Sequence, residues 1–193
     1  PDASATAAEL EAIFHPRSIA VVGASANPDA PGYDYLHSLQ TFGYAGEIYP
    51  VNPRAQEILG LPAYHSLREA PEPVDYVISC IPASAVLDLV DDCAAKGARA
   101  LQLFMARFAE TGRAEGAELE RRLAERARAA GVRIIGPNCM GLLYPALGIS
   151  FRADMPGQPG SIGFLSQSGN LLFDLTYGGG PRGLRFSKAI SYG

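Results

Sequence analysis

The residues of this sequence best suited to chemistry are three small ones, Gly23, Ala24 and Ser25, directly after the apolar run at 19–22. Four consecutive apolar residues, mostly β-branched, are typical of a strand that is buried on both faces. Small residues after such a strand let the phosphates of a ligand approach backbone N–H groups at the start of the next helix. The turn therefore predicts a nucleotide-type site at the carboxyl edge of a Rossmann-like sheet. An ordinary tight turn without a ligand is the alternative.

A second candidate position follows the apolar segment 47–51, which ends in Asn52, Pro53 and Arg54. Dinucleotide-binding domains usually place Asp or Glu here to hold the ribose hydroxyls, and their glycine fingerprint does not begin at Gly23. NAD is therefore disfavoured. A nucleotide with an extra ribose phosphate, either NADP or coenzyme A (CoA), remains open, as does a solvated surface charge for Arg54.

Alternating strands and helices must position these residues. Apolar runs predict strands, and periodic segments between them predict helices, one of them capped by Ser84 and ended by Gly97. The predicted strands cover 19–22, 47–51, 74–81, 100–105 and 132–135, and two further helices cover 33–42 and 112–130. This alternation is the signature of a doubly wound parallel sheet in an α/β protein.

The remainder predicts the start of a second domain. Residues 144–160 carry three prolines and three glycines and are expected to be a linker, after a first domain at 8–143. A strand at 162–165, a helix at 170–177 and a strand at 186–190 follow. About 30 residues cannot bury a core of their own, so we expect 161–193 to be an incomplete second domain.

The composition narrows the class of protein. The 193 residues are 48% hydrophobic with a formal net charge of −4, which gives no general attraction to nucleic acid or membranes. The three cysteines have no disulfide or metal spacing. No apolar run reaches a membrane span, and the N-terminus does not have the pattern of a signal peptide. A cytoplasmic protein without a metal site is expected.

Six ordered segments together resemble one family, the NDP-forming acyl-CoA synthetases, which are relatives of the succinyl-CoA synthetase α subunit. The resemblance covers about 10–193, essentially the whole chain. The segments are FHPRSIAVVGAS (14–25), GEIYPVNPR (46–54), VDYVISCIPA (74–83), FAETG (108–112), RIIGPNCMG (133–141) and GFLSQSGN (163–170).

The resemblance implies a CoA-binding Rossmann domain followed by a flavodoxin-like domain. The family makes an acyl-CoA from an acid, CoA and a nucleoside triphosphate, through an acyl phosphate and a phosphohistidine. The implied CoA contacts are Gly23, Ala24, Ser25 and Asn27 at the diphosphate, Pro53 and Arg54 at the nucleotide end, Ile81, Pro82 and Ala83 beside the cofactor, and Phe108, Ala109 and Glu110 toward the pantetheine arm. Gln167, Ser168 and Gly169 match the loop that receives the phosphohistidine.

Two features depart from the family pattern. Arg107 stands where the family commonly has glycine, and could narrow the thiol channel or supply a phosphate contact. The family's phosphorylated histidine lies beyond position 193, and His15, His37 and His65 do not match its surroundings.

This chain alone is therefore expected to have no catalytic residue and no turnover. ATP or GTP with Mg would act through an ATP-grasp domain or subunit, and the full protein is expected to be an oligomer. A stand-alone CoA-binding sensor and an NADP-dependent oxidoreductase are the alternative functions.

Overall fold

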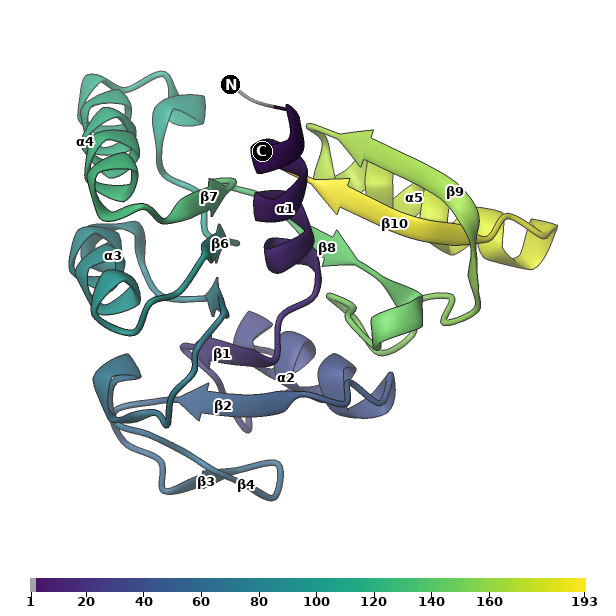
Figure 1. The fold of residues 1–193 in the computed structure, drawn as a ribbon, viewed down its shortest axis with the longest axis horizontal. Helices are drawn as coiled ribbons and strands as arrows, with labels where there is room; N and C mark the ends of the chain where they lie inside the picture. The colour runs from purple at the N-terminus through teal and green to yellow at the C-terminus, as the bar shows by residue number, and fades with distance from the viewer. Residues whose placement is uncertain (1–2) are drawn as a thin grey trace.

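The computed structural model describes residues 3–193, and a five-stranded parallel sheet forms its centre (Figure 1). The strands lie in the order β2-β1-β5-β6-β7, and each neighbouring pair is parallel. Their bounds are β1 (Ser18–Val22), β2 (Glu47–Val51), β5 (Tyr76–Ser79), β6 (Ala100–Leu103) and β7 (Arg133–Ile135). The predicted Rossmann-like α/β fold is confirmed.

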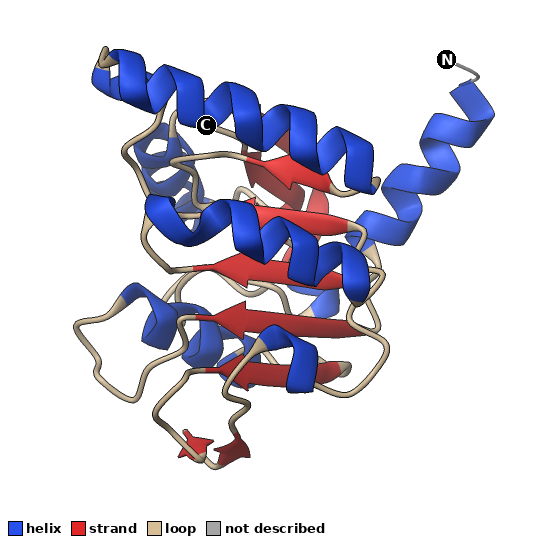
Figure 2. Cartoon of the chain, turned by 90° about the vertical axis from the view of Figure 1, so that its left-hand side faces the viewer, coloured by secondary structure: helices blue, strands red, loops and turns tan. Residues whose placement is uncertain are grey.

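Helices cover both faces of this sheet, which explains why its strands are apolar throughout. Helices α3 (Val86–Ala95) and α4 (Ala114–Ala130) lie across one face, in front of the strands in Figure 2. Ala20 and Val22 of β1 pack in the core on that side. Ile19 and Val21 pack on the other side, with helix α2 (Pro31–Thr41).

A second, three-stranded sheet lies beside the first (Figure 1). Its order is β8-β10-β9, with β9 parallel and β8 antiparallel to the central strand β10. The bounds are β8 (Gly141–Leu143), β9 (Pro159–Ser166) and β10 (Phe186–Ser191), and helix α5 (Gly169–Gly179) connects β9 to β10. The remaining regular elements are α1 (Ala3–Phe14), β3 (Glu57–Ile58), β4 (Leu61–Pro62) and the 3₁₀ segments Leu67–Glu69, Ala83–Ala85, Ala109–Thr111, Pro145–Leu147 and Gly180–Arg182.

The segment 144–160, expected to be a linker, contributes side chains to the core. Ile149 and Phe151 are each 2% exposed and Met155 is 5% exposed. They belong to one apolar cluster with Leu36 of α2 and Phe186 of β10. The two sheets therefore share a core, and the domain boundary within the chain remains a prediction.

An ion pair fixes the opposite, amino-terminal edge of the parallel sheet. The Arg17 guanidinium donates two hydrogen bonds of 2.8 Å to the Asp75 carboxylate, and the Arg17 backbone N–H donates a third of 2.9 Å. The Asp75 side chain is 7% exposed. Hydrogen bonding to Arg17 lowers the pKa of Asp75 below its ordinary value. This contact joins the starts of β1 and β5, so its role is structural.

Candidate functional site

The turn after β1 lies where the strand order of the sheet reverses, between β1 and β5. Gly23 has a φ of +87°, and a Cβ atom there would lie 3.0 Å from the Cys80 carbonyl carbon. A Cβ atom at Gly32, in the first turn of α2, would lie 2.0 Å from the Gly23 carbonyl oxygen. Glycine is therefore required at both positions. Crevices at such reversals are the usual ligand sites of open α/β sheets.

Two amides of this turn already have an acceptor. The N–H groups of Gly23 and Ala24 donate to the Val51 carbonyl oxygen at 3.0 and 3.2 Å. The Asn27 N–H donates to the Ser25 hydroxyl at 3.0 Å. Helix α2 begins with a proline, which has no N–H to offer. The turn lies at the expected place, but it presents fewer open donors than the sequence suggested.

Arg54 lies beside the same turn. The Asn52 side-chain amide donates to the Ala24 carbonyl oxygen at 2.8 Å, and the Asn52 side-chain oxygen accepts the Arg54 N–H at 2.9 Å. Pro53 and Arg54 are both exposed. No ion pair within residues 3–193 includes Arg54. Its guanidinium is therefore available to an anionic ligand.

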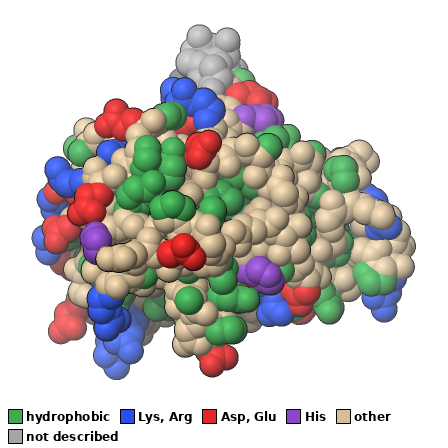
Figure 3. Space-filling view, turned by 90° about the horizontal axis from the view of Figure 1, so that it is seen from below, with side chains coloured by type: hydrophobic (Ala, Val, Ile, Leu, Met, Phe, Trp, Pro, Cys, Tyr) green, Lys and Arg blue, Asp and Glu red, His purple; other side chains and the backbone are tan. Residues whose placement is uncertain are grey.

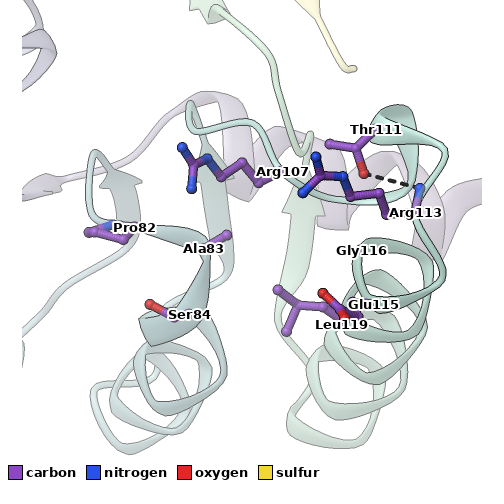
Figure 4. Close-up of a pocket in the computed structure, with 9 residues that line it drawn as sticks. All are labelled: Pro82, Ala83, Ser84, Arg107, Thr111, Arg113, Glu115, Gly116 and Leu119. Carbon is purple, nitrogen blue, oxygen red and sulfur yellow. Dashed lines mark hydrogen bonds between the residues drawn. The ribbon is translucent and has the colours of Figure 1, made fainter.

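A cavity of about 600 Å³ separates the turn after β5 from the loop after β6 (Figure 4). Pro82 and Ala83, both expected beside the cofactor, line it, and Ile81 is half-buried next to them. We call this cavity the arginine cleft because two arginines enter it from the β6 side. The full lining is Pro82, Ala83, Ser84, Arg107, Thr111, Arg113, Glu115, Gly116 and Leu119.

A second cavity, of about 710 Å³, lies between the carboxyl edge of the parallel sheet and the start of α5. It brings Glu110, expected near the pantetheine arm, together with the expected phosphate loop. We call it the junction cavity. Its lining is Phe104, Met105, Ala106, Glu110, Asn138, Cys139, Met140, Gln167, Ser168, Gly169, Asn170 and Gly193.

The loop of Phe108, Ala109 and Glu110 is held by carboxylates. Glu110 accepts the backbone N–H groups of Arg107 and Phe108 at 2.5 and 2.9 Å, and Glu120 accepts that of Ala109 at 3.0 Å. The Phe108 side chain is 1% exposed and packs in the core. The Phe108 side chain therefore belongs to the core and lines neither cavity, whereas Glu110 lines the junction cavity.

The loop of Gln167, Ser168 and Gly169, expected to bind phosphate, caps helix α5. The Ser168 hydroxyl accepts the Leu171 N–H at 3.2 Å, so a cap fills one donor of the first turn. The amides of Gly169 and Asn170 have no acceptor among the hydrogen bonds of residues 3–193. These two donors and the helix dipole point to an anion at this end of the helix.

A buried network of polar side chains lies next to the junction cavity and is joined to it through Met140. The sequence does not predict this network. The Met140 carbonyl oxygen accepts the Tyr35 hydroxyl at 3.0 Å and the Gln102 amide at 3.1 Å, and the Tyr76 hydroxyl donates to Gln102 at 2.9 Å. Burial raises the pKa of both tyrosines well above the usual value. They therefore remain neutral donors.

Missed lining residues include Met105, Asn138, Met140 and Arg113. The segment at 133–141 carries a signal for two of them, because it follows β7 and so reaches the same edge of the sheet as the other turns. Arg113 follows no strand directly and has no such signal.

Cys139 lines the junction cavity, and its side chain is a protonated thiol, which is a poor nucleophile. Burial raises its pKa to about 12, and its Sγ lies 3.4 Å from the Ile135 carbonyl oxygen. Burial likewise raises the pKa of Cys80 to about 12. A thiol with such a pKa is protonated near neutral pH, so neither cysteine supplies a reactive thiolate.

Residues 3–193 contain no group of three or more His, Cys, Asp or Glu side chains arranged to hold a metal ion. Across the same range, the helices are too short or too polar to cross a bilayer.

On the face seen in Figure 3, basic and acidic side chains are interspersed.

A Rossmann-like sheet with glycine-lined turns, and with arginines at its carboxyl edge that form no ion pair within residues 3–193, is typical of a nucleotide-binding domain. The family described as CoA binding domain matches residues 17–145, and the chain belongs to that family.

The chain is similar to acetate–CoA ligases. It is 37% identical to the ADP-forming acetate–CoA ligase II of Archaeoglobus fulgidus, over 97% of this chain and 28% of the relative. It is 38% identical to subunit alpha of the corresponding Pyrococcus furiosus enzyme, over 95% of this chain and 40% of that subunit. These values confirm the resemblance to NDP-forming acyl-CoA synthetases. The chain spans well under half the length of either relative.

A solved structure shows the same fold. It is a dinucleotide-forming acetyl-coenzyme A synthetase 1 from Ca. Korarchaeum cryptofilum, in complex with phosphate and ADP. The TM-score is 0.89 at 35% sequence identity, and the match covers 95% of this chain and 39% of that chain.

Proposed function

We propose that this chain is the CoA-binding part of an NDP-forming acyl-CoA synthetase. The observation that carries the proposal is the junction cavity, in which Glu110 and the loop Gln167, Ser168 and Gly169 line one space. A thiol delivered to that cavity would lie beside the phosphoryl group held at α5. Adjacency of the two is what transfer of an acyl group from phosphate to sulfur requires.

In this proposal CoA extends along the carboxyl edge of the sheet. Its 3′-phosphate lies at Arg54 and its pantetheine arm crosses the turn of Ile81, Pro82 and Ala83. The arm ends near Glu110, in a cavity whose buried cysteine is protonated. The protein's contribution is to position the CoA thiol and to keep competing nucleophiles out of the cavity.

The phosphoryl group would be held by the start of α5. The open amides of Gly169 and Asn170 and the helix dipole favour an anion there. No histidine is among the lining residues of the junction cavity or the arginine cleft. The phosphorylated histidine, the ATP-grasp module and its ATP or GTP with Mg are therefore proposed to come from outside these 193 residues. A location in the cytoplasm also remains a prediction.

Exposed apolar side chains on and near the second sheet favour the presence of a protein partner. Leu165 is 68% exposed, Leu171 is 56% exposed and Tyr192 is 51% exposed. Leu165 lies on β9, which is an edge strand of its sheet among the described residues, whereas Leu171 lies in the first turn of α5 and Tyr192 directly follows β10. Exposed apolar side chains at an edge strand favour coverage by more protein. We propose that the rest of the synthetase, within an oligomer, covers them.

Calorimetry and thermal unfolding with CoA test the proposal. CoA at 100 times its dissociation constant should raise the free energy of unfolding by about 2.7 kcal/mol. NADPH at the same concentration should leave the unfolding temperature unchanged, which would separate a CoA site from a dinucleotide site.

Activity separates a synthetase part from a stand-alone CoA sensor. The 193-residue chain should form no ATP from acetyl-CoA, ADP and phosphate. Addition of a separately expressed ATP-grasp subunit with a histidine-bearing domain should produce that reaction only when this chain is present. A melting curve unmoved by millimolar CoA would refute the binding proposal.

A further inference from the structure

The backbone at Arg107 is held in a conformation that favours glycine. Its φ is +90°, which a residue with a Cβ atom rarely adopts. The Glu110 carboxylate maintains this turn through the backbone N–H groups of Arg107 and Phe108. Non-glycine residues in strained conformations cluster at functional sites. The strain at Arg107 therefore directs attention to the function of its side chain.

That side chain enters the arginine cleft. Figure 4 shows the Arg107 and Arg113 guanidinium groups directed into the space that faces Pro82 and Ala83. Neither arginine is in an ion pair within residues 3–193. Glu115 also lines the cleft, so the two guanidinium groups share it with one carboxylate. That carboxylate forms no ion pair with either arginine within residues 3–193, so both guanidinium groups are open to an anionic ligand.

The turn after β1 offers few hydrogen-bond donors to a diphosphate, so cationic side chains from another element would be needed to bind it. The Gly23 and Ala24 amides are already bonded to Val51, and α2 begins with a proline, so few donors there are open to a diphosphate. Guanidinium groups bind phosphate oxygens through paired, charge-assisted hydrogen bonds. We infer that Arg107 and Arg113 bind the diphosphate of CoA from the β6 side of the edge. This inference rests on the proposed function, and Arg54 remains the proposed contact of the 3′-phosphate.

Titration calorimetry on the 193-residue chain tests the inference with CoA, dephospho-CoA and inorganic pyrophosphate. Arg107→Gln and Arg113→Gln should each weaken CoA and dephospho-CoA by about the same factor, roughly 10-fold. Pyrophosphate binding should weaken with them. Arg128→Gln, in the last turn of α4, removes the same charge far along the helix from the cleft and should leave all three affinities unchanged.

Arg107→Gly separates binding from folding. It relieves the positive φ, so its urea midpoint should be at least that of the wild type, while its CoA affinity falls as in Arg107→Gln. A weaker affinity in a protein of equal or greater stability cannot come from misfolding.

Three results would overturn the inference. In the first, CoA binds wild type and both glutamine variants equally, so the proposed function stands without the cleft. In the second, only CoA weakens and dephospho-CoA does not, which places the 3′-phosphate in the cleft. In the third, Arg128→Gln weakens binding as much as the cleft variants, which indicates a general charge effect. A fourth result, pyrophosphate binding through these arginines in a wild type that does not bind CoA, would overturn the proposed function together with the inference.

Discussion

Replacing Gly32 by alanine tests how tightly helix α2 packs on the turn after β1. A Cβ atom at residue 32 would lie 2.0 Å from the Gly23 carbonyl oxygen and 2.8 Å from its carbonyl carbon. Real Cβ atoms essentially never approach other atoms closer than 3.0 Å. Both neighbours are backbone atoms, so the helix must withdraw by about 1 Å.

The withdrawal affects a well-packed helix. Tyr35, Leu36 and Leu39 of α2 are each at most 3% exposed. We expect Gly32→Ala to lower the free energy of unfolding by about 1–3 kcal/mol, the usual cost of overpacking. The CoA affinity of the folded variant should also fall, because the displaced turn belongs to the proposed site.

Gly178→Ala is the matched control. Gly178 lies in helix α5, and the nearest neighbour of an added Cβ atom is an Arg182 side-chain nitrogen at 3.7 Å. Gly178 has no positive φ, so alanine should raise the free energy of unfolding by about 0.4–1 kcal/mol, chiefly by restricting the unfolded chain. Urea denaturation with equal slopes for all proteins would give the two differences. A Gly32→Ala protein that gains stability as Gly178→Ala does would refute the packing argument.

Three further substitutions test the proposed CoA site, the Arg17–Asp75 ion pair and the cap of helix α5. Arg54→Ala should cost about 1.5–3 kcal/mol of CoA binding and remove the preference for CoA over dephospho-CoA, measured by calorimetry. Equal affinity of the wild type for the two ligands would show that Arg54 is a solvated surface charge without a contact to the 3′-phosphate. Asp75→Asn should lower the free energy of unfolding by about 1.5–3 kcal/mol at pH 7. Because the hydrogen bonds from Arg17 lower the pKa of Asp75 in the folded state, the stability from this pair is complete above the ordinary pKa of an aspartate and is lost as the pH falls through the lower folded-state pKa. The variant should therefore lose less stability on acidification than wild type, and a parallel pH curve would contradict this. Ser168→Ala should lose about 1 kcal/mol of stability in urea and Ser168→Gly only a few tenths, whereas equal losses would argue against the cap.

The sequence predicted the parallel sheet because its signals are strong and local. Each strand is a short apolar run closed by small or turn-forming residues, as at Val22 and Gly23. Of the short strands, β7 is predicted because its apolar residues 132–135 follow Gly131, whereas β8 and the two-residue strands β3 and β4 are not predicted. The start of α2 was placed at residue 33 and lies at Pro31, since proline fits the first helical position.

The site could be predicted only as a set of turns at one edge. Parallel topology brings the residues after β1, β2, β5 and β6 together, whatever their separation in sequence. The state of each backbone donor depends on contacts between turns, such as the Val51 carbonyl beneath Gly23 and Ala24. The meeting of Glu110 with Gln167 in the junction cavity depends on the packing of a second sheet, which no local pattern encodes.

The core shared by the two sheets limits how this region can move. Phe151 and Leu36 pack in the same apolar cluster, and the Met140 carbonyl is bonded to side chains of α2 and β6. A hinge that opened the junction cavity would have to expose that cluster to water and break those buried hydrogen bonds together. We therefore expect the junction cavity to keep its shape when a ligand binds.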